Sequence, residues 1–203
     1  MKIAVIGASG NAGSRITKEL AHRAHAVTAI ARNPEKIVCM QNVTAKAGDV
    51  MDQAALTRLL AGHDIAISAV HFLDSDPKKL IAAISDSKVG RYLVVGGAGS
   101  LEVAPGVRLV TTPGFPAQYK AEAEKGAAFL DLLRRERELN WTFLSPSALF
   151  TAGERTGKFR LGTDQLLTAA DGKSWISFED FAVALADEIE RPAHIRSRFT
   201  VGY

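Results

Sequence analysis

The sequence predicts an α/β protein of the Rossmann type, with a doubly wound, mostly parallel sheet and helices on both faces. Short β-rich runs alternate with longer helical stretches along most of the 203 residues, which is the pattern of repeated β-α-β units. The first run, Lys2–Ile6, is continuously apolar after its lysine, as expected of a strand buried on both faces. A glycine-rich turn and an amphipathic stretch follow directly, so the first β-α-β unit starts at the N-terminus.

The other elements follow in chain order from apolar spacing and from turn residues. Residues four apart mark the first helix, Pro34 ends the second strand, and Pro77 fits the first turn of a helix, where a missing N–H costs nothing. The expected strands are Lys2–Ile6, His25–Ala31, Val43–Ala47, Asp64–Val70, Arg91–Val95, Trp141–Leu144, Phe159–Leu161, Trp175–Ser177 and Arg198–Val201. The expected helices are Asn11–His22, one carrying Leu56, Leu59 and Leu60, one carrying Leu80, Ile81 and Ile84, Tyr119–Glu138 and Glu179–Glu190.

The alternation weakens after Pro146. We therefore expect a single domain over residues 1–203, in which residues 147–203 form a small C-terminal elaboration on the substrate side together with the terminal helix and strand.

Composition excludes several classes of protein. The excess of 25 Lys and Arg over 22 Asp and Glu gives a net charge of +3, but it is spread along the chain, so no nucleic-acid partner is expected. The single cysteine, Cys39, cannot form an internal disulfide, and the five histidines show no spacing of metal ligands, so no metal site is expected. No leader-like or membrane-spanning run is visible, which predicts a cytoplasmic protein without a membrane partner.

The strongest motif is the glycine-rich turn, which contains Gly7, Ser9, Gly10, Asn11, Ala12 and Gly13. In such a turn the first glycine allows the tight bend, the second lets backbone approach a pyrophosphate, and the third lets helix and strand pack closely. The helix that follows presents free N–H groups and a positive dipole end to phosphates. The alternative interpretation is a strand-to-helix turn without a ligand.

The end of the second strand predicts which dinucleotide binds. An acidic residue there would contact the ribose hydroxyls of NAD, but this chain has Arg32, with Lys36 nearby. A guanidinium suits a phosphate, so Arg32 is expected to hold the 2′-phosphate of NADP(H). The alternative is a surface arginine at a strand end.

Two further strand ends complete the expected cofactor site. Asp49 and Val50 suit an adenine contact, although Asp49 or Asp52 could instead cap the next helix beside a core valine. The exit of the fourth strand, Ser68-Ala69-Val70-His71, should pass close to the pyrophosphate and the nicotinamide ribose, because ligands of such sheets lie beyond the carboxyl ends of the strands.

These residues also carry a resemblance. The segments Gly7–Gly13, Ala31-Arg32-Asn33-Pro34, Gly48-Asp49-Val50 and Val94–Ser100 resemble the atypical short-chain dehydrogenase/reductases. The chain is most similar to their NmrA-like and NADH-flavin-reductase-like members, which include the flavin/biliverdin reductase B type. The resemblance covers nearly the whole chain, including Trp141–Pro146, and adds Gly96 and Pro146 to the expected cofactor-binding residues. It implies an NADP(H) site and a substrate pocket above the nicotinamide, with flavin or quinone reduction in some members and NADP sensing without turnover in others.

One departure from the wider family concerns catalysis. The Tyr-x-x-x-Lys dyad of standard short-chain dehydrogenases is absent, because Ala123 stands four residues after Tyr119. Lys120 and Lys125 lie at spacings that cannot replace the lysine on the same helix face. Alcohol–ketone chemistry, and with it an epimerase or hydroxysteroid dehydrogenase, is therefore disfavoured.

Hydride transfer to a conjugated acceptor needs a flat apolar slot more than it needs an acid. Tyr119, Ser100 and His71 are the candidate catalytic residues, although Ser100 also suits a turn and His71 a structural role. Phe72, Phe115, Pro116 and Phe150 are candidates for the slot or, alternatively, for plain packing.

The sequence thus predicts an NADPH-dependent oxidoreductase that passes hydride to a flavin, a quinone or a similar small-molecule conjugated acceptor. FMN or FAD would be a substrate rather than a bound cofactor, and the protein would be a monomer or a homodimer. The competing hypothesis is a non-catalytic redox sensor that binds NADP and regulates a partner.

Overall fold

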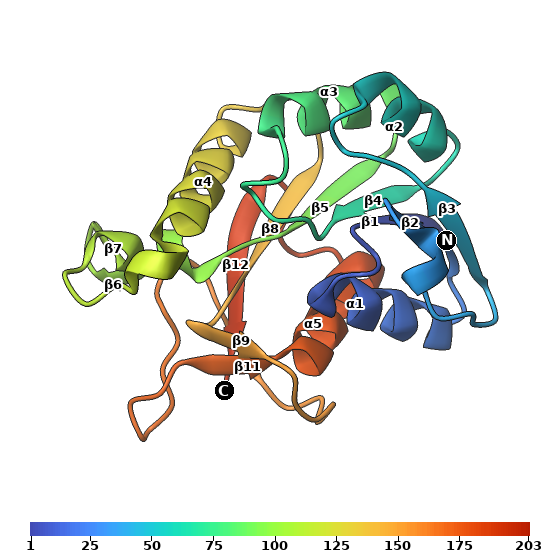
Figure 1. Ribbon diagram of the computed structural model, residues 1–203. Coiled ribbons are helices and arrows are strands. Elements are labelled where there is room, and N and C mark those ends of the chain that lie inside the picture. Colours follow the sequence, from blue (N-terminus) through green and yellow to red (C-terminus); the bar gives the residue numbers. More distant parts are fainter.

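The computed structural model describes residues 1–203 and has three layers (Figure 1). Its central sheet has eight strands in the order β10-β12-β8-β5-β4-β1-β2-β3, all parallel except the β10–β12 pair. The chain moves outward from β1 to β3, then crosses to the other side of β1 and continues outward from β4. This doubly wound order confirms the predicted fold class.

The elements are as follows. The strands are β1 (Lys2–Ile6), β2 (Ala26–Ala31), β3 (Val43–Ala47), β4 (Ile65–Ser68), β5 (Arg91–Val95), β6 (Glu102–Ala104), β7 (Val107–Arg108), β8 (Trp141–Pro146), β9 (Leu149–Thr151), β10 (Arg160–Gly162), β11 (Trp175–Ser177) and β12 (Ser197–Gly202). The α-helices are α1 (Asn11–His22), α2 (Gln53–Leu60), α3 (Pro77–Ser87), α4 (Ala117–Leu133) and α5 (Phe178–Glu190). Single 3-10 turns are formed by Pro34–Lys36, Ala98–Ser100 and Leu109–Thr111.

Alternate side chains of the parallel strands feed two separate cores. On one face, residues such as Ile3 and Val5 pack against α1 and α5, and on the other face Ala4 and Ile6 pack against α2, α3 and α4. Figure 1 shows the same division, with α2, α3 and α4 above the sheet and α1 and α5 below it. Because both faces are covered, the central strands β1, β4 and β5 are buried almost throughout, as the run at β1 predicted.

The expected long helix ends five residues early. It was predicted to reach Glu138, but α4 ends at Leu133, the last buried residue of its inward face. The residues that follow are mostly charged and exposed, so no core contact stabilises further helical turns.

The C-terminal segment was expected to form a substrate-side elaboration together with the terminal helix and strand. The helix α5 covers one face of the sheet, and β12 and β10 extend its edge. Only the loops around the two-stranded β9–β11 sheet project from it (Figure 1). The strand β9 and the β6–β7 hairpin were not predicted. Their strands are only two or three residues long and carry no periodic signal.

Ion pairs tie the two lower helices together. Arg23, directly after α1, reaches Asp187 (2.7 Å) and Glu190 (2.9 Å) of α5, and it also bonds Glu19 one turn earlier. Arg155, from the loop after β9, bonds both oxygens of Glu19 and is the main reason why the pKa of that carboxyl lies below its ordinary value. This arrangement holds α1, α5 and the β9–β10 loop as one unit.

None of the helices combines the length and the hydrophobicity needed to span a bilayer.

Candidate functional site

A cavity of about 560 Å³ lies at the carboxyl end of the parallel strands. It runs across the point where the strand order reverses, between β1 and β4, which is where open α/β sheets bind their ligands. Its lining contains Ile6, Gly7, Ser9, Gly10, Asn11, Ala12, Ile30, Ala31, Arg32, Asn33, Lys36, Gly48, Asp49, Val50, Met51, Ala69, Val70, His71, Phe72, Asp74, Val95, Gly96, Glu122, Phe150 and Phe178.

The glycine-rich turn has the geometry that its motif predicted. Gly7 has φ +82°, and a Cβ there would overlap the carbonyl oxygen of Ala69 at the end of β4. A Cβ at Gly13 would overlap the carbonyl oxygen of Gly7, so helix and turn touch backbone to backbone. A Cβ at Gly10 would lie 3.3 Å from that same oxygen. Side chains at Gly7 and Gly13 would therefore push apart the two strands that border the cavity or lift the helix from them.

The N-terminus of α1 lies free at the cavity. No side chain caps it and its first turn has no acidic residue, whereas Asp52, Asp76 and Ser177 cap α2, α3 and α5. Uncapped N–H groups and the positive end of the helix dipole attract an anion. Ser9, Asn11 and Ala12 line the cavity at this point, so the residues present fit a pyrophosphate.

Beside this helix end lies the cationic part of the wall. Arg32 and Lys36 both line the cavity, and neither makes an ion pair with an acidic side chain of this protein. Val50 lines the adjacent wall together with Asp49. One oxygen of Asp49 accepts the N–H of Met51 (2.9 Å), and Asp52 is the residue that caps α2 through the N–H of Ala55. Asp49 is thus not the helix cap, and its second oxygen is available to a ligand.

Three of the expected cofactor-binding residues, Gly13, Ser68 and Pro146, do not line the cavity. Ala69 and Val70 at the exit of β4 line the cavity, as does Gly96 after β5. Ser68 is buried on the other side of the strand, where its hydroxyl bonds Tyr92 (2.7 Å), because alternate residues of a strand face opposite sides. Pro146 is buried at the end of β8 and does not line the cavity.

The far end of the cavity depends on a contact between α4 and the loop after β4. Glu122 of α4 accepts the N–H groups of Phe72 (2.7 Å) and Leu73 (2.8 Å) with its two carboxylate oxygens. One helical turn later, Gly126 leaves room for the ring of Phe72, since a Cβ there would lie 2.7 Å from that ring. The helix thus holds both the backbone and the side chain of this loop, and His71 next to it lies 3.4 Å from Glu122.

Aromatic rings form the opposite wall of this end. The rings of Phe150 and Phe178 are 4.5 Å apart and meet edge to face, and both line the cavity. The guanidinium of Arg15 lies 5.6 Å from the centre of the Phe178 ring and bonds Glu179 (3.0 Å). Burial raises the pKa of Glu179, but the bonds from Arg15 and from the Gly153 N–H outweigh it and hold the pKa below its ordinary value. Arg15 and Glu179 therefore form a charge-neutral pair.

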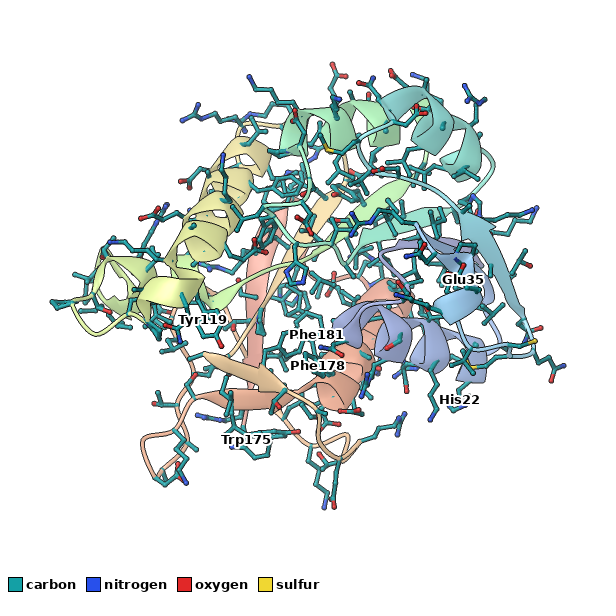
Figure 2. The ribbon with its side chains drawn as sticks, viewed as in Figure 1. His22, Glu35, Tyr119, Trp175, Phe178 and Phe181 are labelled. Atoms are coloured by element: carbon teal, nitrogen blue, oxygen red, sulfur yellow. The ribbon has the colours of Figure 1, made fainter.

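The position on α4 that the lysine of a Tyr-x-x-x-Lys dyad would take packs against the turn after β5. Ala123 stands at that position and packs closely on Gly99. A Cβ added to Gly99 would lie 2.7 Å from the Cβ of Ala123. Tyr119 is 61% exposed and lies in the first turn of α4 (Figure 2), outside the cavity lining. The expectation that Tyr119 faces substrate is not supported.

Ser100 also lies away from the cavity. It is buried in the turn after β5, 3.4 Å from the guanidinium of Arg198. Of the three candidate catalytic residues only His71, whose side chain is 82% exposed, lines the cavity. Of the four candidates for the slot, Phe72 and Phe150 line it, and Phe115 and Pro116 do not.

Sequence reasoning missed Glu122, Phe178 and Arg15. Glu122 could have been found from its spacing, one helical turn after Tyr119 on the same helix. Phe178 and Arg15 meet from helices that are 163 residues apart in the chain, at 178 and 15, and no local pattern indicates such a contact. No group of three or more His, Cys, Asp or Glu side chains is arranged to hold a metal ion.

Comparisons with known proteins agree with this geometry. A structure of a candidate exported protein from Burkholderia pseudomallei is 45% identical, with TM-score 0.91 over 100% of both chains. A candidate epimerase from Bacteroides thetaiotaomicron is 39% identical, with TM-score 0.95 over 100% of this chain and 96% of that one. A candidate NADH-flavin reductase from Streptococcus pneumoniae is 37% identical, with TM-score 0.83 over 100% and 99%.

The three relatives thus share the fold over their whole length but carry different descriptions. The model of the NAD(P)H-binding family matches residues 7–192, which include the glycine-rich turn and both ends of the cavity. The chain belongs to the NAD(P)H-binding family.

Proposed function

We propose that this protein is an NADPH-dependent oxidoreductase that passes hydride to a flavin, a quinone or a similar conjugated acceptor. The observation that carries the proposal is the continuity of one cavity from an uncapped helix end to a pair of phenylalanine rings. A dinucleotide that binds its phosphates at α1 has the length to reach those rings across the switch point. The similarity to a candidate NADH-flavin reductase from Streptococcus pneumoniae supports the same proposal.

The preference for NADPH over NADH rests on Arg32 and Lys36. Both cationic side chains lie on the wall beside the turn, without an acidic partner, where the ribose 2′-phosphate would lie. Asp49 and Val50 would face the adenine, and Gly7, Ser9, Gly10, Asn11 and Ala12 the pyrophosphate. Ala69, Val70 and Gly96 would border the nicotinamide half.

The chemistry asks little of the protein beyond positioning. When bound, the nicotinamide supplies a hydride, so that the acceptor gains two electrons and one hydrogen, takes its second hydrogen as a proton from water, and leaves the cofactor oxidised. The chain's part is to hold two flat rings in contact and to exclude water between them. Phe150 and Phe178 supply an apolar wall for this, and Glu122 fixes the loop that faces them.

The test is anaerobic oxidation of NADPH, and separately of NADH, with riboflavin and with menadione as acceptors. We expect turnover above the rate without protein and a higher kcat/KM for NADPH. Tight binding of NADPH without turnover of either acceptor would instead favour a redox sensor. The prediction of a cytoplasmic location remains untested, and one relative is described as a candidate exported protein.

A further inference from the structure

The two ends of the cavity carry opposite charge. Its cationic lining residues, Arg32 and Lys36, both lie at the end formed by β2 and the turn after it, where the one lining carboxylate is that of Asp49. At the end formed by α4, α5 and the loop after β4, the lining contains the carboxylates of Asp74 and Glu122 and no lysine or arginine. The imidazole of His71, 3.4 Å from Glu122, is the one basic side chain of the lining there, and in its neutral form it leaves both carboxylate charges uncompensated. An anion is therefore attracted to one end and repelled from the other.

The charge on Glu122 is fixed in place. Each of its oxygens accepts a backbone N–H, from Phe72 at 2.7 Å and from Leu73 at 2.8 Å. Using both oxygens as acceptors is the arrangement of an ionised carboxylate. Asp74 follows directly in the same loop, and its carboxylate has no hydrogen-bond or ion-pair partner in this protein. The loop thus presents two negative groups, one rigid and one free.

Arg15, which lies against Phe178 at this end, does not compensate for them. The Nε of Arg15 bonds Glu179 at 3.0 Å, and its Nη1 lies 3.4 Å from the carbonyl oxygen of Asn11 and from the hydroxyl of Ser14. Its plane also faces the ring of Phe178. With its charge paired and its donors directed to protein groups, Arg15 is not placed to bind an anionic substituent of a second substrate.

We infer that the second substrate is an uncharged planar ring, such as a quinone or an isoalloxazine without a phosphate, and that Glu122 and Asp74 select against acceptors with a negative charge near the ring. This inference rests on the proposed function and specifies its acceptor. The phenylalanine wall gives affinity for the ring, and the carboxylates set which rings enter. FMN carries its phosphate on a flexible chain, so it should be disfavoured less than a quinone whose charge is on the ring.

The kinetic test compares 1,4-naphthoquinone with its 2-sulfonate as acceptors. For each quinone, the rate with protein is divided by the rate at which NADPH reduces that quinone without protein. We expect kcat/KM to favour the neutral quinone about tenfold, as one unscreened like-charge contact would give. Glu122→Gln and Asp74→Asn should each reduce that preference by about threefold, and added salt should reduce it as well. Glu124→Gln, an exposed residue of the same helix, is the matched control and should leave the preference unchanged.

A binding test separates this inference from the proposed function. Riboflavin and FMN share one ring and differ in a phosphate, and quenching of their fluorescence reports binding to protein saturated with NADP⁺, which has no hydride to give. Tighter binding of riboflavin, with the difference reduced in Glu122→Gln, supports the inference even if no acceptor turns over. Equal or tighter binding of FMN, an equal or higher kcat/KM for the sulfonate, or an unchanged preference in both carboxylate variants overturns it. Failure of both flavins to bind and of both quinones to turn over overturns it too, since a ring must enter. Melting temperatures establish that each variant is folded.

Discussion

The two ends of the cavity are built in different ways. The end that would hold the nucleotide comes from three short segments, Gly7–Gly13, Ala31–Lys36 and Gly48–Met51, each at the exit of its own strand. The end that would hold the acceptor comes from side chains far apart in the sequence, with Phe72 against Glu122 and Phe150 against Phe178. The first is encoded locally and the second depends on tertiary packing, so the two should respond separately to substitution.

The largest effect should follow from Gly13→Ala. Its Cβ would meet the carbonyl oxygen of Gly7, a backbone atom that can move only with the whole turn. We expect a loss of about 1–3 kcal/mol in the free energy of unfolding, as is usual for overpacking, and a rise in the NADPH dissociation constant of roughly 100-fold, since the helix end is displaced from the phosphates.

Urea unfolding and a fluorescence titration with NADPH measure these two quantities. Gly114→Ala is the control, because no atom lies within 4 Å of a Cβ at that position. Unchanged binding in Gly13→Ala would contradict the placement of the phosphates at α1.

Next in size is Arg32→Ala. Loss of one or two charge-assisted bonds to a phosphate should raise the NADPH dissociation constant about 10- to 100-fold and leave the NADH value nearly unchanged. Calorimetric titration with both cofactors checks this, with Arg58→Ala on the exposed side of α2 as the control. Equal changes for the two cofactors would show that Arg32 does not read the 2′-phosphate.

Gly126→Ala should affect only the end of the cavity that would hold the acceptor. The new Cβ would lie 2.7 Å from the ring of Phe72 and would press the loop held by Glu122 toward the cavity. We expect the KM for the acceptor to rise about two- to tenfold, from strain of the usual overpacking size, while the NADPH dissociation constant stays the same. Steady-state kinetics and the NADPH titration separate the two effects, and a parallel loss of NADPH affinity would mean that the ends are coupled.

Acid should weaken the ion pairs that Glu19 makes with Arg155 and Arg23, which hold α1, α5 and the β9–β10 loop together. The pKa of Glu19 is lowered in the folded protein, first by Arg155 and also by Arg23, so its ionisation stabilises the fold above the unfolded-state pKa of about 4.3. That contribution is lost as the pH falls below about 4.3 and through the lower folded value.

Arg155→Gln should therefore cost about 1 kcal/mol or less at neutral pH, given the exposure of the arginine, and flatten the loss of stability in acid. Thermal unfolding between pH 3 and pH 7 measures both, and an acid profile as steep as that of the unsubstituted protein would contradict the role of this pair.

The smallest effect is expected at Tyr119. Tyr119→Phe should leave kcat and KM unchanged for both acceptors, because the side chain is largely exposed and lies outside the cavity lining. A loss of kcat in this variant would show that α4 or the cofactor moves so as to bring the hydroxyl to the acceptor.

This comparison also explains what the sequence could predict. The alternation of strands and helices, the glycine-rich turn and the place of Arg32 follow from local rules, in which apolar spacing and the residue types at strand ends indicate the local backbone. Tyr119 and Ser100 were proposed from their places at the start of the long helix and after the fifth expected strand, and such a place does not tell whether a side chain faces the cavity.

At the acceptor end, by contrast, the positions of Glu122, Phe178 and Arg15 depend on how α4, α5 and α1 pack on the sheet. In a strand that is buried on both faces, such as β4, the apolar pattern does not show which face of the sheet the last residue takes. Ser68 was therefore expected in the cavity, but its hydroxyl bonds Tyr92 on the other face.

The most direct test of the account is a single turnover. The protein is loaded with one equivalent of NADPH without oxygen and mixed rapidly with excess menadione, and the absorbance of the reduced nicotinamide is followed. We predict a decay faster than that of free NADPH, and a return to the free rate when the protein is first saturated with NADP⁺. Stoichiometric NADPH binding with no faster decay would show that the cavity binds the cofactor but does not bring an acceptor to it.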